Sequence, residues 1–277
     1  MPYVTVGQEN SQPINIYFED HGSGQPVVLI HGFPLSGHSW ERQEAALLEG
    51  GYRVIAYDRR GFGASSQPSV GYDYDTFTAD LDALLQHLDL QDVVLVGFSM
   101  GSGEVARYLG KYGSDRVSKA VLMSPIPPYL LQSSDNPQGV PQSVFDGIED
   151  SIRKDRPAFL STFFENFYNV DVLGGSRISK EAVQMSWNVA AGASATATLA
   201  CVPTWLTDFR QDVARINVPT LIVQGDADRI LPNEATGARL PELIKGSEYV
   251  VIKDGPHAIG WTHAEEVNAA LLAFLGK

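Results

Sequence analysis

Short apolar runs alternate with amphipathic segments along the first half of the chain, and the alternation returns near its end. Continuous apolar runs bounded by turns are typical of strands that helices cover on both faces. Residues 76–88 carry apolar side chains at helical spacing and predict one such helix. Strands that alternate with helices predict an α/β fold with a mostly parallel sheet, right-handed crossovers and helices on both faces. The predicted strands are residues 14–18, 26–30, 52–57, 93–96, 117–123, 219–224 and 249–252.

The strand pattern is interrupted between about residues 126 and 216. Prolines punctuate the first part of this stretch, and helical segments rich in aromatic residues follow. Because strands precede and follow the stretch, we interpret it as a helical insertion into one sheet. The prediction is a single α/β domain over residues 1–277 with a helical insertion at about 126–216.

The chain is acidic, with 20 Lys+Arg against 33 Asp+Glu and a formal net charge of −13 over 277 residues. Nucleic acids and anionic membrane surfaces are recognised by clustered basic residues, so neither is an expected partner. A single cysteine, Cys201, cannot form an intramolecular disulfide, and with six scattered histidines it predicts no metal site. The N-terminus lacks the pattern of a secretory signal, and no stretch approaches the roughly 20 apolar residues of a membrane helix. We therefore expect a cytoplasmic protein that does not bind membranes.

The segment Gly97-Phe98-Ser99-Met100-Gly101 has the pattern G-x-S-x-G, directly after a predicted strand and before a predicted helix. Such a turn holds the serine in a strained conformation that lifts its hydroxyl above the edge of the sheet. The following helix directs its N-terminus at the same place, where it favours negative charge. Side chains at positions 97 and 101 would collide, which explains both glycines. We predict that Ser99 is a nucleophile; the alternative is an ordinary glycine-rich turn.

A serine nucleophile needs a base, and the base needs an acid that orients it. His257 follows the predicted strand 249–252 at the same edge of the sheet and is the leading candidate for the base. His263 falls in the first turn of the last helix, and we interpret it as a capping or surface residue. Asp226 and Asp228 both follow the strand 219–224, and position alone allows either to be the acid.

An oxyanion formed by serine attack needs two main-chain N–H donors. Met100, next to the nucleophile, provides the first. The loop His31-Gly32-Phe33-Pro34 follows an earlier strand, and its glycine permits close approach, so we assign the N–H of Phe33 as the second. His31 then orients this loop and takes no part in acid–base chemistry.

Five motifs occur in a fixed order: H-G-F-P, D-R-R-G-F-G-A-S-S, G-F-S-M-G, G-D-A-D-R-I-L-P and G-P-H. Together they resemble the α/β-hydrolase superfamily over essentially the whole chain, and the order Ser, Asp, His is the order expected there. The stretches V-G-Q-E-N-S, H-G-F-P-L-S-G-H-S-W-E-R-Q and W-T-H-A-E-E-V-N resemble the cofactor-free bacterial haloperoxidases, or perhydrolases. Many members are also esterases or lactamases. The resemblance implies an eight-stranded sheet, a cap over the site, Asp228 as the acid and Asp226 as a loop residue.

The implied reaction begins when Ser99 attacks a short carboxylic acid or ester, with His257 as base, and forms an acyl-enzyme. Hydrogen peroxide then replaces water as the second nucleophile, and the resulting peracid oxidises bromide or chloride in solution. Neither a cofactor nor a metal is needed. A proline after the oxyanion residue is associated with peroxide use, and Pro34 has that position, so Phe33, Pro34 and Met100 are expected to contact the substrate. Many relatives have tryptophan where this chain has Phe33, and some are trimers, which implies a homo-oligomer.

Three alternatives compete with this interpretation. A carboxylesterase or lactamase with incidental halogenation would use the same acyl-enzyme. Dehalogenases and epoxide hydrolases of this fold place aspartate where Ser99 stands, which disfavours them. A ligand receptor without catalysis could keep the fold, but the presence of the triad, the oxyanion loop and Pro34 together argues against it.

Overall fold

The computed structural model describes residues 2–277, so that Met1 of the predicted domain lies outside the described part. The described residues form a sheet of eight strands in the order β1-β2-β4-β3-β5-β6-β7-β8. The pairs β1–β2 and β2–β4 are antiparallel, and every other neighbouring pair is parallel, as predicted. The strands are β1 (Tyr3–Glu9), β2 (Gln12–Gly22), β3 (Pro26–Ile30), β4 (Arg53–Tyr57), β5 (Val93–Phe98), β6 (Val117–Met123), β7 (Thr220–Gly225) and β8 (Glu248–Ile252).

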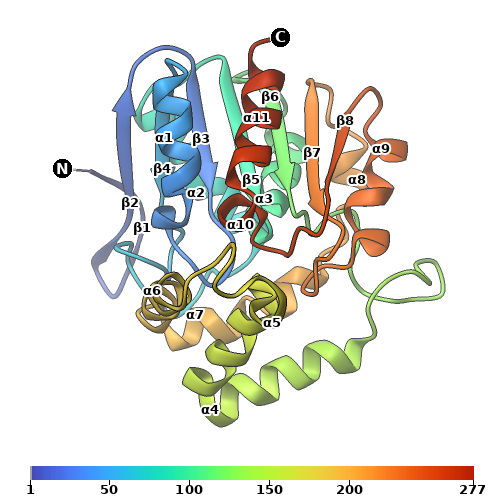
Figure 1. Ribbon diagram of the computed structural model, residues 1–277. Coiled ribbons are helices and arrows are strands. Elements are labelled where there is room, and N and C mark those ends of the chain that lie inside the picture. The colour runs from blue at the N-terminus through green and yellow to red at the C-terminus, as the bar shows by residue number, and fades with distance from the viewer. Residues whose placement is uncertain (1) are drawn as a thin grey trace.

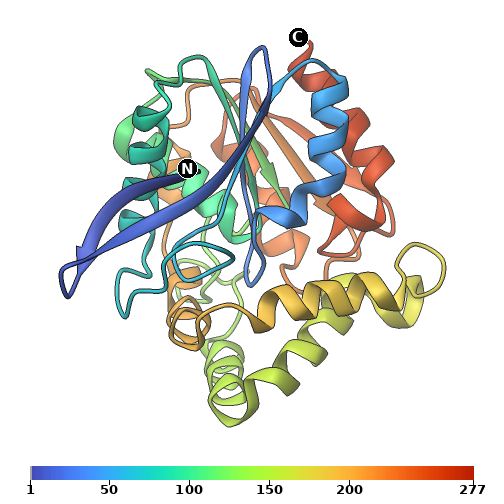
Figure 2. The same cartoon turned by 90° about the vertical axis from the view of Figure 1, so that its left-hand side faces the viewer.

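Helices cover both faces of the sheet, as predicted (Figure 1). Side chains alternate between the two faces, so Val28 and Ile30 join one hydrophobic core while Val27 and Leu29 join the other. All four are fully buried, which explains why the strand reads as an uninterrupted apolar run. Figure 2 shows the two layers from the side of β1 and β2. One layer holds η1 (Gly37–Trp40), α1 (Glu41–Glu49), α10 (Ile259–Thr262) and α11 (Ala264–Leu275), and the other holds α2 (Tyr74–His87), α3 (Met100–Tyr112), α8 (Arg210–Val213) and α9 (Leu240–Leu243).

The strand β1 is missing from the sequence prediction, and β2 is longer than the predicted residues 14–18. Only Val4 of β1 is buried, because this strand lies at the edge of the sheet with most side chains exposed, and it therefore has no apolar run. A two-residue turn at Asn10 and Ser11 joins the strands, and both residues have positive φ, 48° and 64°. This is the geometry of a hairpin turn that matches the twist of the sheet.

A helical cap lies below the carboxyl edge of the parallel strands (Figure 1). In the chain it follows β6 and precedes β7. It spans about residues 142–213, less than the predicted 126–216, because residues 126–141 form a loop with isolated bridges. The longest helix bends at Asp155, whose carboxylate accepts from the N–H of Ala158 and caps the half that starts near Pro157. The cap consists of α4 (Gln142–Tyr168), α5 (Val170–Leu173), α6 (Lys180–Ala191), α7 (Ala195–Ala200) and η2 (Pro203–Leu206), and ends at α8.

Within residues 2–277, no helix is by itself both long and apolar enough to cross a membrane. One pair, Lys180–Ala191 with Ala195–Leu206, meets the length and composition requirement jointly but bends by 99° between its members.

Candidate active site

Ser99 sits at the turn between β5 and α3 with φ 54° and ψ −119°, a conformation that costs of order 1–3 kcal/mol in a residue other than glycine. Its own N–H donates to the carbonyl of Met123 on β6 at 2.8 Å, which anchors the turn. A Cβ atom at position 97 would lie 2.4 Å from the carbonyl oxygen of Gly101. A Cβ atom at position 101 would lie 2.2 Å from the carbonyl oxygen of Ile30 on the neighbouring strand. Both glycines of the motif are therefore sterically required.

Three of the predicted site residues come together at the carboxyl edge of the sheet. The hydroxyl oxygen of Ser99 lies 2.8 Å from Nε2 of His257, and Nδ1 of His257 lies 2.7 Å from Oδ2 of Asp228. The side chains of His257 and Asp228 are fully buried, and Ser99 is 6% exposed. The loop after β7 carries Asp228, and the loop after β8 carries His257, as the sequence predicts.

Four hydrogen bonds converge on the Asp228 carboxylate and use both of its oxygens as acceptors. Oδ1 accepts from the N–H groups of Ile230 and Leu231, both at 2.8 Å. Oδ2 accepts from Gln224 at 2.9 Å and from Nδ1 of His257. With Nδ1 of His257 as the donor, Nε2 is left as the acceptor for the Ser99 hydroxyl. Asp226 is not part of this arrangement, which agrees with its assignment as a loop residue.

Two aromatic rings hold the imidazole of His257 in place. The ring centroids of Phe98 and Phe167 lie 5.1 Å and 5.2 Å from that of His257. The hydroxyl of Ser124 donates to the carbonyl oxygen of His257 at 2.9 Å. Phe167 lies on the cap, and nothing in the sequence distinguishes it from the other aromatic residues there.

The loop after β3 approaches the serine turn closely. A Cβ atom at Gly32 would lie 2.8 Å from the Phe98 ring and 2.9 Å from Cβ of Ser99, so only glycine fits there. Among the described residues, no protein acceptor is found for the main-chain N–H of Phe33 or of Met100. Both predicted oxyanion donors are therefore free to bind an oxyanion.

The buried ion pair between Arg59 and Glu104 supports the loop that carries His31 and Phe33. Arg59 donates its main-chain N–H to Nε2 of His31 at 3.0 Å and its Nη2 to the His31 carbonyl at 2.8 Å. Since Nε2 accepts, Nδ1 of His31 is the nitrogen that donates to the Gly32 carbonyl, at 2.9 Å. Nε of Arg59 pairs with the carboxylate of Glu104, which also accepts from Tyr57 at 2.5 Å.

Burial holds the pKa of His31 well below its usual value, and the neighbouring charge of Arg59 adds to this. A neutral His31 suits the orienting role predicted for it. Burial alone would lower the pKa of Arg59, but the Glu104 carboxylate, Tyr57 and other neighbouring groups together outweigh burial, and the pKa is raised. Glu104 was not singled out from the sequence, although it is a charged residue among apolar ones on the sheet-facing side of α3.

A cavity of about 240 Å³ opens above Ser99. Its walls include Phe33, whose ring packs 4.8 Å from that of Trp205. The indole N–H of Trp205 is buried without an acceptor. Pro34 and Met100, predicted to contact substrate, are buried beside the site but do not form part of the cavity wall. The cap supplies most of the remaining wall, namely Val144, Phe145, Ile148, Phe159, Thr162, Phe163 and Asn166.

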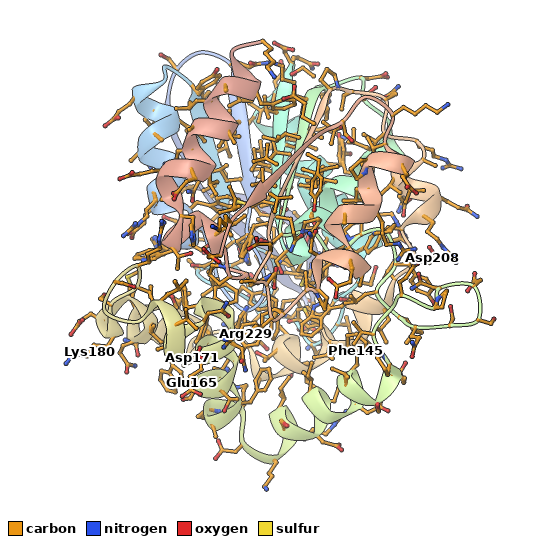
Figure 3. All side chains as sticks on the ribbon, turned by 45° about the vertical axis from the view of Figure 1, so that its right-hand side comes forward. Phe145, Glu165, Asp171, Lys180, Asp208 and Arg229 are labelled. Carbon is orange, nitrogen blue, oxygen red and sulfur yellow. The ribbon has the colours of Figure 1, made fainter. Side chains whose placement is uncertain are left out.

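An ion pair joins the cap to the loop that carries Asp228. Arg229 and Asp171 lie next to each other where this loop meets α5, and Phe145 lies farther along the cap (Figure 3). The two hydrogen bonds from Arg229 to Asp171 measure 2.7 Å and 3.2 Å. The amide of Asn169 adds a bond to the Ala227 carbonyl at 2.8 Å. These contacts fix the cap over the site.

The interpretation of His263 as a capping or surface residue is wrong. It occupies the position before α11, but its side chain makes no capping bond and is 2% exposed. Its Nδ1 lies 2.9 Å from the Thr262 hydroxyl, and burial lowers its pKa. Arg177 of the cap donates to the Thr262 carbonyl at 3.1 Å, directly before His263 in the chain.

Among the residues that the structure describes, one group is spaced to share a metal ion, namely Glu19, His21 and Glu44. None of these residues belongs to the active site.

Comparisons with known proteins identify the family. The family profile for the alpha/beta hydrolase fold matches residues 25–264. The chain belongs to the α/β-hydrolase family. This α/β-hydrolase is 70% identical to a protein from Synechocystis sp. named "Putative non-heme chloroperoxidase", over 99% of this chain and 100% of the relative. It is 36% identical to a bifunctional esterase/perhydrolase from Acinetobacter calcoaceticus, with 99% of each chain covered.

The solved structures agree with this placement. The crystal structure of a bromoperoxidase from Bacillus anthracis superimposes with a TM-score of 0.96, at 49% identity and with 99% of each chain covered. The predicted fold class and the prediction of an enzyme are thereby confirmed. This α/β-hydrolase falls among the non-heme haloperoxidases and perhydrolases.

Proposed function

We propose that this enzyme is a serine hydrolase that forms an acyl-enzyme on Ser99 from short carboxylic acids or esters. The single observation that carries the proposal is the continuous hydrogen-bonded chain from the Ser99 hydroxyl through His257 to Asp228, with links of 2.8 Å and 2.7 Å. Buried groups at such distances activate a hydroxyl that is otherwise inert.

The first half of the reaction uses groups already in place. Nε2 of His257 takes the Ser99 proton while Oγ bonds to the acyl carbon, and the charge that develops on the carbonyl oxygen is received by the N–H groups of Phe33 and Met100. Asp228 stabilises the imidazolium without taking its proton. The imidazolium then protonates the leaving group, an alcohol from an ester or water from an acid, as the C–O bond breaks.

The second half can use either of two nucleophiles. His257 removes a proton from water or from hydrogen peroxide as the oxygen of that molecule bonds to the acyl carbon. The bond between the acyl carbon and Oγ of Ser99 then breaks, His257 returns the proton to Oγ, and the carboxylic acid or the peracid is released. The peracid oxidises bromide or chloride to hypohalite and is itself reduced to the carboxylic acid. Peroxide use is supported by the relatives named as haloperoxidases and perhydrolase, and by Pro34 directly after the oxyanion residue. The small apolar cavity above Ser99 suits short acyl groups.

Parallel assays test the proposal. One follows hydrolysis of a short aryl ester, and the other follows bromination of monochlorodimedone in acetate, bromide and hydrogen peroxide. We expect the wild type to catalyse both and Pro34→Leu to lose more peracid formation than ester hydrolysis. Equal losses would mean that Pro34 only shapes the fold. Hydrolysis without bromination would favour the carboxylesterase or lactamase alternative, to which the relative named esterase/perhydrolase also points. The single-domain organisation and the homo-oligomer stay predictions.

A further inference from the structure

A buried glutamine ties the acid of the triad to the sheet. Gln224 belongs to β7, is fully buried and lies four residues before Asp228. Its Nε2 donates to Oδ2 of Asp228 at 2.9 Å and to the carbonyl oxygen of Leu231 at 3.3 Å. Gln224 therefore fastens the loop that carries Asp228 to the strand from which this loop starts.

The orientation of the Gln224 amide follows from its neighbours. Oδ2 of Asp228 already receives Nδ1 of His257, and the second neighbour is a carbonyl oxygen, so only the nitrogen end of the amide can face them. At the other end, Oε1 of Gln224 is buried without a donor among the residues that the structure describes. Gly237 packs so closely there that a Cβ atom at its position would lie 2.8 Å from Oε1. The glutamine thus directs its donors at the acid loop and leaves its acceptor unused.

Packing alone does not explain a glutamine at this position. A buried acceptor without a donor costs free energy, and an unbranched apolar side chain of similar length, such as methionine, avoids that cost. What the glutamine adds is the N–H donor to the carboxylate of Asp228. An unsatisfied polar group kept in a native core is a reason to look for a functional role.

The bond from Gln224 differs from the other bonds on this carboxylate. The N–H groups of Ile230 and Leu231 come from the same loop as Asp228 and fix Oδ1. Gln224 comes from the sheet and fixes Oδ2, the oxygen that receives Nδ1 of His257. With Oδ2 fixed, the imidazole keeps the orientation in which its Nε2 faces the nucleophile.

We propose that Gln224 is a positioning residue for the reaction, which holds Oδ2 of Asp228 where His257 needs its acceptor. Gln224 does not line the cavity above Ser99, so it acts through Asp228 and not on the substrate. The inference rests on the proposed function, since it assigns Gln224 a task in acyl transfer by Ser99. Loss of the donor should therefore lower kcat and leave KM unchanged.

Ester hydrolysis by two matched methionine variants tests the proposal. Gln224→Met removes the donor and the unpaired oxygen and keeps the length of the side chain. Gln43→Met is the control, because Gln43 is also buried but donates to the Gly260 carbonyl at 2.8 Å and to Asn268 at 3.0 Å. We expect Gln224→Met to lower kcat about 10- to 100-fold, as a small misplacement of reacting groups does, and Gln43→Met to keep the wild-type kcat. Gln224→Asn, which withdraws the donor by one methylene, should show the same loss and replaces Gln224→Met if that variant does not fold.

Two further measurements separate positioning from a general loss of structure. The proton on Nδ1 of His257 should give a downfield NMR resonance in the wild type and in Gln43→Met, and this resonance should shift or broaden in Gln224→Met. In an Asp228→Ala background, Gln224→Met should lower kcat no further, because the carboxylate through which Gln224 acts is gone.

Failure of this inference can be told apart from failure of the proposed function. A wild-type enzyme that neither hydrolyses esters nor reacts with a fluorophosphonate at Ser99 would overturn the proposed function, and the role of Gln224 with it. With an active wild type, the role of Gln224 alone is overturned by any of three results. These are a wild-type kcat or an unchanged His257 resonance in Gln224→Met, an equal loss of kcat in Gln43→Met, and losses from Gln224→Met and Asp228→Ala that multiply in the double variant.

Discussion

Replacing Glu104 with glutamine tests whether the buried ion pair supports the oxyanion loop. The Glu104 side chain is fully buried and that of Arg59 is 1% exposed. Glutamine keeps the shape of the side chain and can still accept from Tyr57 and Arg59, but it leaves the guanidinium without a counter-charge. Removing one partner of a buried pair costs about 3–5 kcal/mol. Because the amide retains hydrogen bonds, we expect the lower end, about 3 kcal/mol.

Urea denaturation followed by tryptophan fluorescence measures this loss. The free energy of unfolding falls by about 3 kcal/mol per M urea for a protein of this size. A loss of about 3 kcal/mol in that free energy therefore lowers the midpoint of unfolding by about 1 M urea. The partly exposed pair Arg53–Asp20, joined at 2.7 Å and 2.8 Å, provides the matched control. Asp20→Asn should cost no more than about 1 kcal/mol, because solvent screens that pair.

The kinetic constants of Glu104→Gln provide a second test. Arg59 holds His31 at two atoms, and His31 holds the loop that carries the Phe33 N–H. Full loss of an oxyanion donor costs about 10²–10³ in kcat, so partial misplacement should lower kcat about 10-fold with little change in KM. The reasoning is refuted if Glu104→Gln lowers the free energy of unfolding by less than about 1 kcal/mol. It is also refuted if the variant is destabilised while its kcat stays at the wild-type value.

Three other predictions concern single side chains. Ser99→Ala and His257→Ala should each lower kcat for ester hydrolysis by about 10⁴-fold or more with unchanged circular dichroism, and substantial remaining turnover would refute the triad. Because the pKa of folded His31 lies well below 6.5, the unfolded chain takes up a proton that the folded protein does not, and stability is lost as pH falls below about 6.5. The loss should reach up to about 1.4 kcal/mol per pH unit relative to His31→Gln, measured by urea denaturation, and equal slopes in the two proteins would contradict it. Cys201 is buried and its pKa is raised to about 12, so iodoacetamide should modify it only in denaturant, and rapid alkylation of the folded protein would disagree.

The sheet and the serine turn could be predicted because their constraints are local in sequence. A strand buried on both faces, such as Pro26–Ile30, must be apolar throughout, and the turn at Ser99 tolerates only glycine at positions 97 and 101. The strand Tyr3–Glu9 could not be found in the same way, since an exposed edge places few demands on side chains.

Other features depend on contacts between distant segments. Asp226 and Asp228 occupy equivalent positions in sequence, and only the N–H groups of Ile230 and Leu231 and the approach of His257 distinguish the second. Arg59 and Glu104 meet across 45 residues of chain, with no local pattern that links them. His263 is buried beside the Thr262 carbonyl to which Arg177 of the cap donates, and helical periodicity alone does not reveal such a contact.

The central claim is that Ser99 is a nucleophile activated by His257. Reaction of the folded enzyme with a fluorophosphonate, followed by peptide mass spectrometry, tests it most directly. The account predicts one adduct, on Ser99, and a greatly reduced rate of its formation in His257→Ala. A folded protein that stays unmodified, or that carries the adduct on another residue, would contradict the account.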